Sequence, residues 1–326
     1  MSGATTARVM VAAALSAGLS FMGPSFAQQT VPDTLEAHIR AATVAAGLDL
    51  GGILTVCLPR NSPDPRPAND VAEPMKVFDN LYYVGLQSVS AWAVTTSQGI
   101  IVIDTLNNAQ EAQTSIEGGL RRLRLNPVDI KYIIITHAHA DHYGGATYLA
   151  DKFHAQLVMS DLDWSYLEGP QQRPEAPNRG PIPKRGLSVK DGDKLTLGDT
   201  TIELYVTPPH TPGTLSLIIP VKDGGMQHFA GEWGGTAFNF APTLENFKTY
   251  AASAERFTKI AADKKVDVPL SNHPIFDDAL LKMQALKARR SGQPHPFVTG
   301  AASEARYLTV AAECAKARAA ALNEKN

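Results

Sequence analysis

The segment 136–145, with the sequence THAHADHYGG, carries the densest group of potential metal ligands in the chain. His137, His139, Asp141 and His142 follow directly after the apolar run KYIII. Side chains alternate along a strand, so we expect His137 and His139 to face the same way and to bind one cation together. After the chain turns, Asp141 and His142 can reach a neighbouring position. Imidazole and carboxylate suit Zn²⁺, with Fe or Mn as alternatives, so the motif predicts a metal site at a strand end.

Two further histidines lie in similar contexts. His210 ends the stretch TIELYVTPPH, and His273 ends VDVPLSNH. Each terminates an apolar run, and the ends of strands are where open α/β sheets bind ligands. Both are therefore candidate ligands. The alternative is a structural role in a turn, which the Asn-His-Pro sequence at 272–274 also permits.

The elements that must position these residues can be read from the periodicity of the sequence. LYYVG, SAWAVTT and GIIVIDT are rich in β-branched and aromatic residues and predict strands from Val77 onward. Residues 107–125 have the apolar spacing of a helix, and KYIIITH has that of a strand buried on both faces. Antiparallel strands are expected between 187 and 221, and helices over 244–262, 277–290 and 301–322. This order predicts an α/β fold with two strand-rich layers covered by helices.

Composition limits the class of protein. The chain has 326 residues, 44% hydrophobic and 19% charged, with 30 basic and 32 acidic residues and a net charge of −2. These values are those of an ordinary globular protein, and the absence of a basic excess argues against a nucleic-acid partner.

The N-terminus is predicted to be a signal peptide, residues 1–27. Arg8 is the only charge among the first 32 residues, the apolar stretch 9–22 follows, and Ser25-Phe26-Ala27 supplies small residues for cleavage after Ala27. A periplasmic or secreted protein is expected, without a membrane span once the signal is removed. The alternative is an uncleaved anchor helix.

Three further segments complete the predicted organisation: an N-terminal arm over 28–76, a main domain over 77–290, and a C-terminal helix over 291–326 packed on that domain. The two cysteines, Cys57 and Cys314, are too few for a cysteine-based zinc module. An exported protein meets an oxidising environment, so they are a possible disulfide. Two unpaired thiols are the alternative.

The chain resembles the metallo-β-lactamase superfamily over 77–290. The resemblance rests on three motifs: HAHADH, then HTPG about 70 residues later, and a histidine at a strand end about 60 residues further. Within it, the pattern is closest to the third subclass of class B β-lactamases, which are exported and use no cysteine ligand. The resemblance implies a four-layer αββα sandwich that holds two Zn²⁺ ions at one edge of its two sheets. By the same resemblance, the ligands divide into one group for each metal: His137, His139 and His210, and Asp141, His142 and His273.

The sequence departs from this family pattern after the stretch HFAG. Glu232 stands where glyoxalase II and acyl-homoserine lactonases carry a metal-bridging Asp, and Trp233, Gly234 and Gly235 replace small hydroxyl residues that help to hold a β-lactam carboxylate. Glu232, Trp233 and Tyr143 are therefore expected beside the metals or the substrate. The alternatives are a surface acid at a strand end for Glu232 and burial in the core for the aromatic residues.

Four cations in the loop 169–186, namely Arg173, Arg179, Lys184 and Arg185, could attract an anionic substrate or could be solvated surface charges.

The resemblance implies an antibiotic-resistance function: a zinc-dependent hydrolase that opens β-lactam amides by attack of metal-bound hydroxide, with Asp141 as the catalytic residue that orients it. The expected partner is a small molecule with a cyclic or activated carbonyl. A lactonase, esterase or thioesterase of the same fold is the first alternative. A non-hydrolytic redox or binding protein with the same metal site is the second.

Overall fold

The computed structural model describes residues 32–58, 68, 70–170 and 178–324. The predicted signal peptide and part of the predicted N-terminal arm, 28–76, lie outside these ranges. No helix in the described ranges is long and apolar enough to cross a membrane.

The first sheet contains seven strands that follow one another in chain order. Their bounds are β1 (Met75–Lys76), β2 (Leu81–Tyr83), β3 (Trp92–Thr96), β4 (Gly99–Ile103), β5 (Ile130–Ile134), β6 (Gln156–Ser160) and β7 (Leu187–Val189). Pairing is antiparallel from β1 to β4 and parallel from β4 to β7. The carboxyl ends of the parallel strands therefore lie at one edge of the sheet, where β4 ends before Asp104 and β5 ends before the THAHADH segment.

The second sheet has five strands in the order β12-β11-β10-β9-β8. These are β8 (Lys194–Leu197), β9 (Thr200–Val206), β10 (Leu215–Asp223), β11 (Met226–Trp233) and β12 (Val268–Ser271), all antiparallel except the parallel pair β11–β12. Apolar residues of both sheets, among them Val94, Ile134, Leu217 and Val268, form one buried cluster. The two sheets therefore share a common core.

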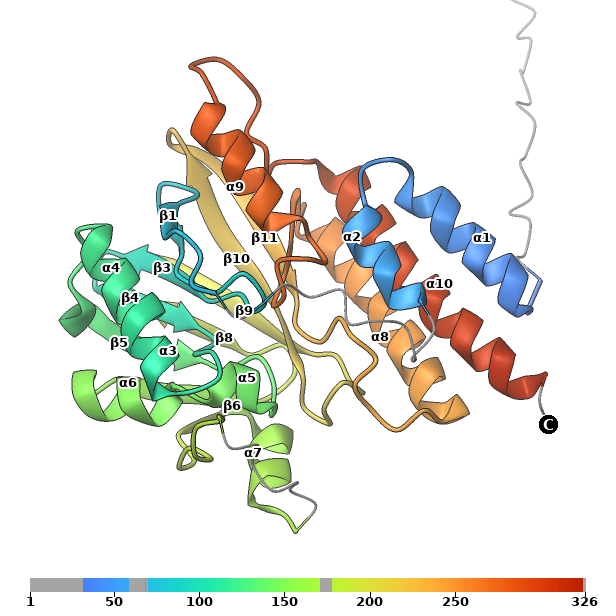
Figure 1. The fold of residues 1–326 in the computed structure, drawn as a ribbon, viewed down its shortest axis with the longest axis horizontal. Coiled ribbons are helices and arrows are strands. Elements are labelled where there is room, and N and C mark those ends of the chain that lie inside the picture. The colour runs from blue at the N-terminus through green and yellow to red at the C-terminus, as the bar shows by residue number, and fades with distance from the viewer. Residues whose placement is uncertain (1–31, 59–67, 69, 171–177, 325–326) are drawn as a thin grey trace, which may run out of the picture. The chain divides into compact units, whose positions relative to one another are not determined.

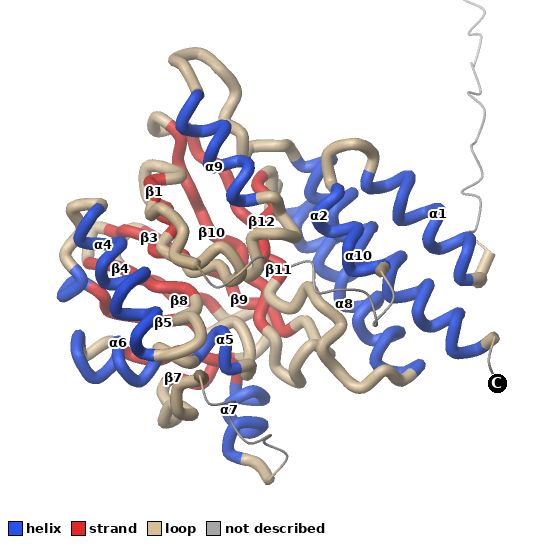
Figure 2. The backbone as a smooth tube through the Cα atoms, in the orientation of Figure 1, coloured by secondary structure: helices blue, strands red, loops and turns tan. Residues whose placement is uncertain are grey.

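Helices cover the outer face of each sheet (Figures 1 and 2). Over the first sheet lie α3 (Ala109–Glu111), the π-helical η2 (Ala112–Glu117), α4 (Gly118–Arg122), α5 (Ala140–Tyr143), α6 (Ala146–Phe153) and α7 (Asp161–Glu168), with the short η3 (Pro127–Asp129) before β5. Over the second lie α8 (Leu244–Asp263), α10 (Ala301–Asn323), α1 (Leu35–Ala46), α2 (Gly51–Leu54) and η1 (Thr55–Cys57). Together with α9 (Ala279–Ala288), they complete the four-layer α/β sandwich that the sequence predicted.

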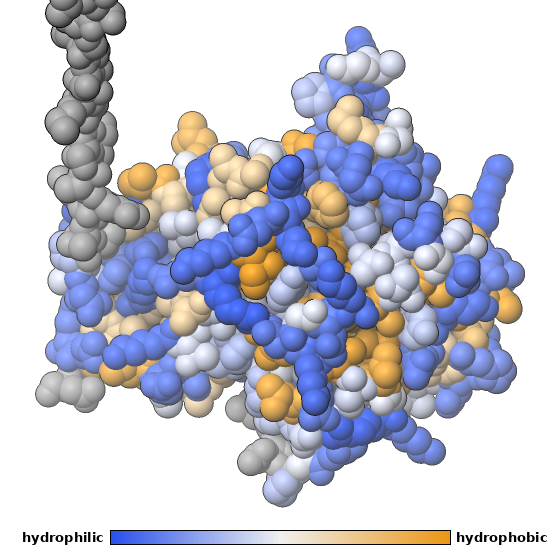
Figure 3. Space-filling model, turned by 180° about the vertical axis from the view of Figure 1, so that it is seen from behind, coloured by the Kyte–Doolittle hydropathy of each residue, from blue (hydrophilic) through white to orange (hydrophobic). Residues whose placement is uncertain are grey.

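The Ala-rich sequence of α10 explains its central place among these helices. Ala311, Ala312, Ala315 and Ala319 are buried in a cluster that includes residues of α1 and α8. Small side chains allow other helices to approach closely, so α10 packs against both α1 and α8. On the face opposite to that of Figure 1, hydrophilic residues are interspersed with smaller apolar patches (Figure 3), as is usual for a folded domain.

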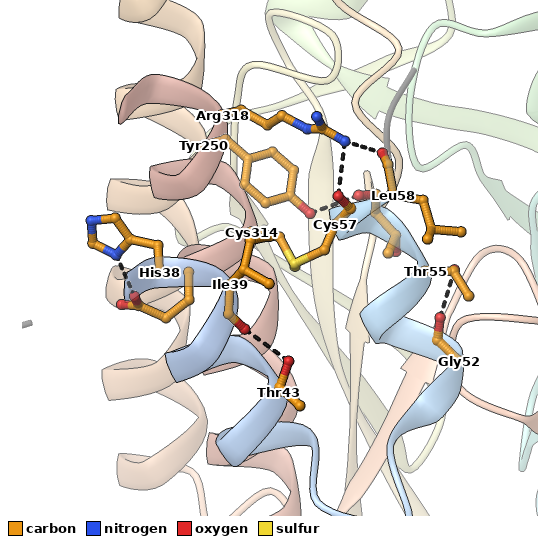
Figure 4. Close-up of a disulfide and its surroundings, with 12 residues drawn as sticks. His38, Ile39, Thr43, Gly52, Thr55, Cys57, Leu58, Tyr250, Cys314 and Arg318 are labelled. Atoms are coloured by element: carbon orange, nitrogen blue, oxygen red, sulfur yellow. Dashed lines mark hydrogen bonds and ion pairs between the residues drawn. A yellow bond between two sulfur atoms is a disulfide. The ribbon is translucent and has the colours of Figure 1, made fainter. Parts of the chain in front are cut away.

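A disulfide between Cys57 and Cys314 attaches η1 to α10, with the two Cα atoms 4.8 Å apart (Figure 4). The same helix holds the N-terminal segment through polar contacts. His38 Nδ1 lies 2.7 Å from a Glu313 carboxylate oxygen, and Arg318 donates to the carbonyl oxygen of Cys57 at 2.9 Å. Residues 35–57 are therefore part of the helical layer on the second sheet rather than a separate domain.

Candidate metal centre

The THAHADH segment is a turn beyond the end of a strand. β5 ends at Ile134, and Asp104, at the end of the neighbouring β4, accepts hydrogen bonds of 2.8 Å from both the backbone N–H and the hydroxyl of Thr136. The expectation that His137 and His139 face the same way because they lie within a strand is therefore wrong. The turn brings the two rings together instead, with their centroids 4.8 Å apart.

All six predicted ligand residues meet at this sheet edge. They form two groups, within each of which the potential ligand atoms lie within 4.8 Å of one another. The first group is His137, His139 and His210, and the second is Asp141, His142 and His273. The groups are adjacent, since the rings of His137 and His142 have centroids 4.0 Å apart.

Hydrogen bonds fix the orientation of several of these imidazoles. His210 Nδ1 lies 2.5 Å from the carbonyl oxygen of Ala237, and His273 Nδ1 lies 2.7 Å from that of Ser88. A carbonyl oxygen only accepts, so each Nδ1 must donate and each Nε2 then carries the lone pair when the ring is neutral. Such contacts orient histidines that bind metals.

The Nε2 atoms lie where a cation can join them. His210 Nε2 and His137 Nε2 are 3.1 Å apart. His142 Nε2 is buried without a hydrogen-bond partner in the described chain, while its Nδ1 lies 2.6 Å from Asp104. An Asp141 carboxylate oxygen is 3.7 Å from His142 Nε2 and 3.9 Å from His273 Nε2. The donor set of each group therefore fits a divalent cation.

Electrostatics favour the metal-binding forms of His137, His210 and Asp141, but the protonated form of His142. Burial, helped by the surrounding histidines, lowers the pKa of His137 and His210 well below the usual value, so both are neutral at neutral pH. Burial tends to raise the pKa of Asp141, but His142, His273, His139 and Arg179 outweigh it and lower that pKa, so Asp141 is ionised. For His142, burial is outweighed by Asp104 and Asp141, which raise its pKa.

Two acidic residues that support the site were not among the predicted site residues. Asp104 contacts both Thr136 and His142 and so links the two ligand groups. Its position at the end of the apolar run GIIVI, like those of the ligand histidines, was a usable signal.

Asp163, at the start of α7, is the second supporting acid. It accepts hydrogen bonds from Ala138 N at 3.0 Å, Thr211 Oγ1 at 2.5 Å and Gly213 N at 2.6 Å. The carboxylate therefore fixes the turn between His137 and His139 to the turn that follows His210. Nothing in the local sequence around Asp163 distinguishes it from an ordinary acid in the first turn of a helix.

Glu232 belongs to the interior, outside both ligand groups. It is 1% exposed on β11, and its Oε2 has no hydrogen-bond partner among the described residues. Burial raises its pKa well above the usual value, and the charges of Asp104 and Asp277 add to this effect. The surface-acid alternative is therefore wrong, and Glu232 is a neighbour of Asp104 behind the ligands.

The two aromatic candidates are core residues. Trp233 is 1% exposed, and its indole N–H donates to Tyr250 Oη at 2.8 Å. Side chains alternate along β11, so Trp233 points toward α8 and α10 while Glu232 points into the core between the sheets. Tyr143 is also buried, among the helices over the first sheet. The expectation that Trp233 contacts the substrate is therefore wrong.

The glycines that follow Trp233 are required by close packing. A Cβ atom on Gly234 would lie 1.7 Å from the carbonyl oxygen of Leu215, and one on Gly235 would lie 2.5 Å from Cβ of His210. A hydroxyl side chain at Gly235 would displace a predicted metal ligand, so the fold leaves no room for substrate-binding side chains at these two positions.

Comparison with known proteins extends these observations. The family model of the metallo-β-lactamase superfamily matches residues 84–224. The crystal structure of BJP-1, a subclass B3 metallo-β-lactamase of Bradyrhizobium japonicum, is 30% identical with a TM-score of 0.59, and the match covers 79% of this chain and 93% of that chain.

Two curated relatives match shorter regions. The protein YobT of Bacillus subtilis is 30% identical over 149 residues, which are 44% of this chain and 61% of YobT. A hydroxyacylglutathione hydrolase of Prochlorococcus marinus is 26% identical over 167 residues, which are 48% of this chain and 58% of that protein. The chain thus spans about three fifths of the length of these curated relatives.

Proposed function

This chain belongs to the metallo-β-lactamase superfamily of hydrolases, and we propose that it opens β-lactam amides with two divalent cations, Zn²⁺ in the first instance. The observation that carries the proposal is the pair of adjacent ligand groups, which contain five histidines, one aspartate and no cysteine. The similarity to BJP-1 over nearly all of that enzyme supports a β-lactam substrate.

The ligand residues themselves argue for bound cations. His210 Nε2, which carries a lone pair when the ring is neutral, lies 3.1 Å from His137 Nε2, and the buried His142 Nε2 has no hydrogen-bond partner among the described residues. A cation in each group would bind these nitrogen atoms. Each group supplies three protein ligands, which leaves room for water or substrate, as in catalytic rather than structural zinc sites.

When bound, a pair of divalent cations makes hydroxide available from water near neutral pH and polarises a carbonyl group. The protein positions the reactants. Asp141, ionised and beside His142 and His273, would orient the attacking water and accept its proton. Asp104 would keep His142 in place by holding its Nδ1, since a carboxylate partner fixes the tautomer of a ligating histidine.

A thioester or lactone is the second candidate substrate. Gly234 and Gly235 offer no hydroxyl side chain beside His210, and the relative from Prochlorococcus marinus is named as a hydroxyacylglutathione hydrolase. We further propose that residues 1–27 direct export to the periplasm and are removed, since the disulfide suits an oxidising compartment.

One comparison of substrates tests the proposal. Zinc-loaded protein would be incubated side by side with benzylpenicillin, a carbapenem, a homoserine lactone and S-lactoylglutathione, and its zinc content would be measured. We expect close to two equivalents of zinc and a higher kcat/KM for the β-lactams than for the other compounds. Faster cleavage of the thioester or the lactone would favour the second candidate. One equivalent or less of zinc after saturation would contradict a two-metal site.

A further inference from the structure

Arg179 extends from a short segment that is docked on the ligand motif. Gly180 N donates to the carbonyl oxygen of Asn107 at 2.8 Å, and the carbonyl oxygen of Asn178 accepts from Asn108 at 3.0 Å. A Cβ atom on Gly180 would lie 1.8 Å from the carbonyl oxygen of Gly144, so only glycine permits this approach. Gly144 follows His142 by two residues, and the base of the Arg179 side chain is therefore fixed beside the second ligand group.

No residue of the described ranges forms a hydrogen bond with Nη1 of the Arg179 guanidinium group. This Nη1 is buried, and Arg179 forms no ion pair within the described chain. Arg185, six residues later, shows the contrary case, because it forms ion pairs with Asp161 and Glu168. Of the two arginines of this loop that the structure describes, Arg185 is ion-paired with neighbouring acids and Arg179 is not, while Arg173 lies outside the described residues.

The charge of Arg179 acts on the candidate metal centre. It is among the charges that lower the pKa of Asp141, and it opposes the protonation of His142. The six ligand residues supply one carboxylate, so two bound divalent cations would leave the centre strongly positive, with the Arg179 cation next to it. A buried cationic donor without an acceptor is unfavourable, and a bound anion would remove that cost.

We propose that Arg179 binds a carboxylate group of the substrate while the carbonyl to be cleaved lies at the two ligand groups. Arg179 is then a specificity-determining residue, and the substrates are carbonyl compounds that also carry a carboxylate. The planar guanidinium group suits this role because it can form two parallel hydrogen bonds with a carboxylate. This inference rests on the proposed hydrolase function, whose substrate class it narrows.

Matched substrates and variants test this role. Arg179→Gln and Arg179→Lys would be compared with Arg185→Gln, which removes the neighbouring ion-paired arginine. The substrates are benzylpenicillin and its methyl ester, which differ only in the charged group. For Arg179→Gln we expect kcat/KM to fall about 10- to 100-fold on the acid, mainly through KM, and less than 3-fold on the ester. Arg179→Lys should lie in between, and Arg185→Gln should match the wild type. Equal losses on the acid and the ester would overturn the proposal.

A binding experiment separates this inference from the proposed function. Calorimetry with zinc-loaded protein would compare succinate with its monomethyl ester, neither of which contains a β-lactam, a lactone or a thioester. We expect wild-type protein to bind succinate at least about 10-fold more tightly than the monoester, and Arg179→Gln to bind both alike. This result would support the role of Arg179 even if no penicillin were hydrolysed. Equal affinity of wild type and Arg179→Gln for succinate, at equal zinc content, would contradict it.

Discussion

The candidate metal centre and the acidic interior behind it both bury ionisable side chains, but the two regions handle them differently. The acidic interior consists of Glu232, Asp277 and Glu304 with Lys282 and Tyr307. The charge of Asp277 acts on Glu232 and Tyr307, and that of Lys282 acts on Asp277 and Glu304. Burial raises the pKa of Asp277 to about 7 and that of Glu304 to about 8. In the metal centre, burial instead keeps His137 and His210 neutral, while Asp141 remains ionised.

Both regions contain buried polar atoms without hydrogen-bond partners, but the atoms differ in type and in their neighbours. His142 Nε2 in the metal centre and Oε2 of Glu232 and of Glu304 in the interior lack hydrogen-bond partners within the described chain. The histidine nitrogen lies among other ligand atoms. Glu232 lies near Asp104 and Asp277, and Glu304 lies near Lys282, whose charge does not outweigh the burial of the Glu304 carboxyl, so the pKa of both acids is raised. A buried polar atom without a hydrogen-bond partner therefore indicates a metal site only where several potential ligand atoms lie together.

Asp141→Ala is expected to have the largest effect. It removes the only carboxylate of the ligand groups, so zinc content should fall from about two equivalents to about one, and kcat/KM should fall on the order of 10³-fold. The melting temperature should change little, because the residue lies at the sheet edge. Asp151→Ala, which alters an exposed acid on α6, is the control and should behave as wild type. Retention of both zinc ions without Asp141 would contradict its role.

Asp104→Asn tests whether a buried acid beside the metal centre supports metal binding while one in the acidic interior does not. The amide cannot hold both Thr136 and His142 as the carboxylate does, so we expect zinc affinity or kcat/KM to fall about 10- to 100-fold. Glu232→Gln is the matched control, since it makes the same change in the neighbouring buried acid. Its zinc content should be unchanged and its activity within about 3-fold of wild type. Similar losses of zinc affinity or kcat/KM in Asp104→Asn and Glu232→Gln would show that the two acids do not differ in their support of the metal centre.

Asp163→Ala tests the coupling of the two ligand turns. It leaves three donors, on Ala138, Thr211 and Gly213, without their acceptor. The free energy of unfolding should fall by about 3 to 5 kcal/mol in urea denaturation. Because both turns belong to the first ligand group, the weaker binding step in a zinc titration should involve that group. Unchanged zinc binding would show that Asp163 only stabilises the fold.

Glu304→Gln tests whether Glu304 in the acidic interior makes the stability of the protein depend on pH. The pKa of Glu304 is about 8 in the folded protein, against an ordinary value near 4.5. Protonated Glu304 contributes fully to the free energy of unfolding below about pH 4.5, and this contribution is lost as the pH rises to about 8.

The wild type should therefore lose about 2 to 4 kcal/mol relative to Glu304→Gln between pH 5 and pH 8, measured by urea denaturation. Activity at pH 7 should be the same. If the free energies of unfolding of the wild type and Glu304→Gln changed equally with pH, Glu304 would not be protonated in the folded protein.

The sequence alone predicted the class of fold and the six candidate ligand residues that the structure brings together. Histidines after apolar runs, in HAHADH and at His210 and His273, are local signals, because open α/β sheets bind ligands beyond the carboxyl ends of their strands. The apolar periodicities likewise predicted helices near 107–125 and 301–322, which the structure contains.

Only the tertiary structure decided which residues support those ligands. Asp104 meets His142 from 38 residues away, and Asp163 meets Gly213 from 50 residues away. Alternation along β11 places Glu232 and Trp233 on opposite faces, but the sequence does not say which face meets the helices. The docking of Gly180 on Gly144, which places Arg179 beside the ligands, depends on the packing of a loop against a distant turn. These contacts join segments with no local pattern in common, so only the folded chain determines them.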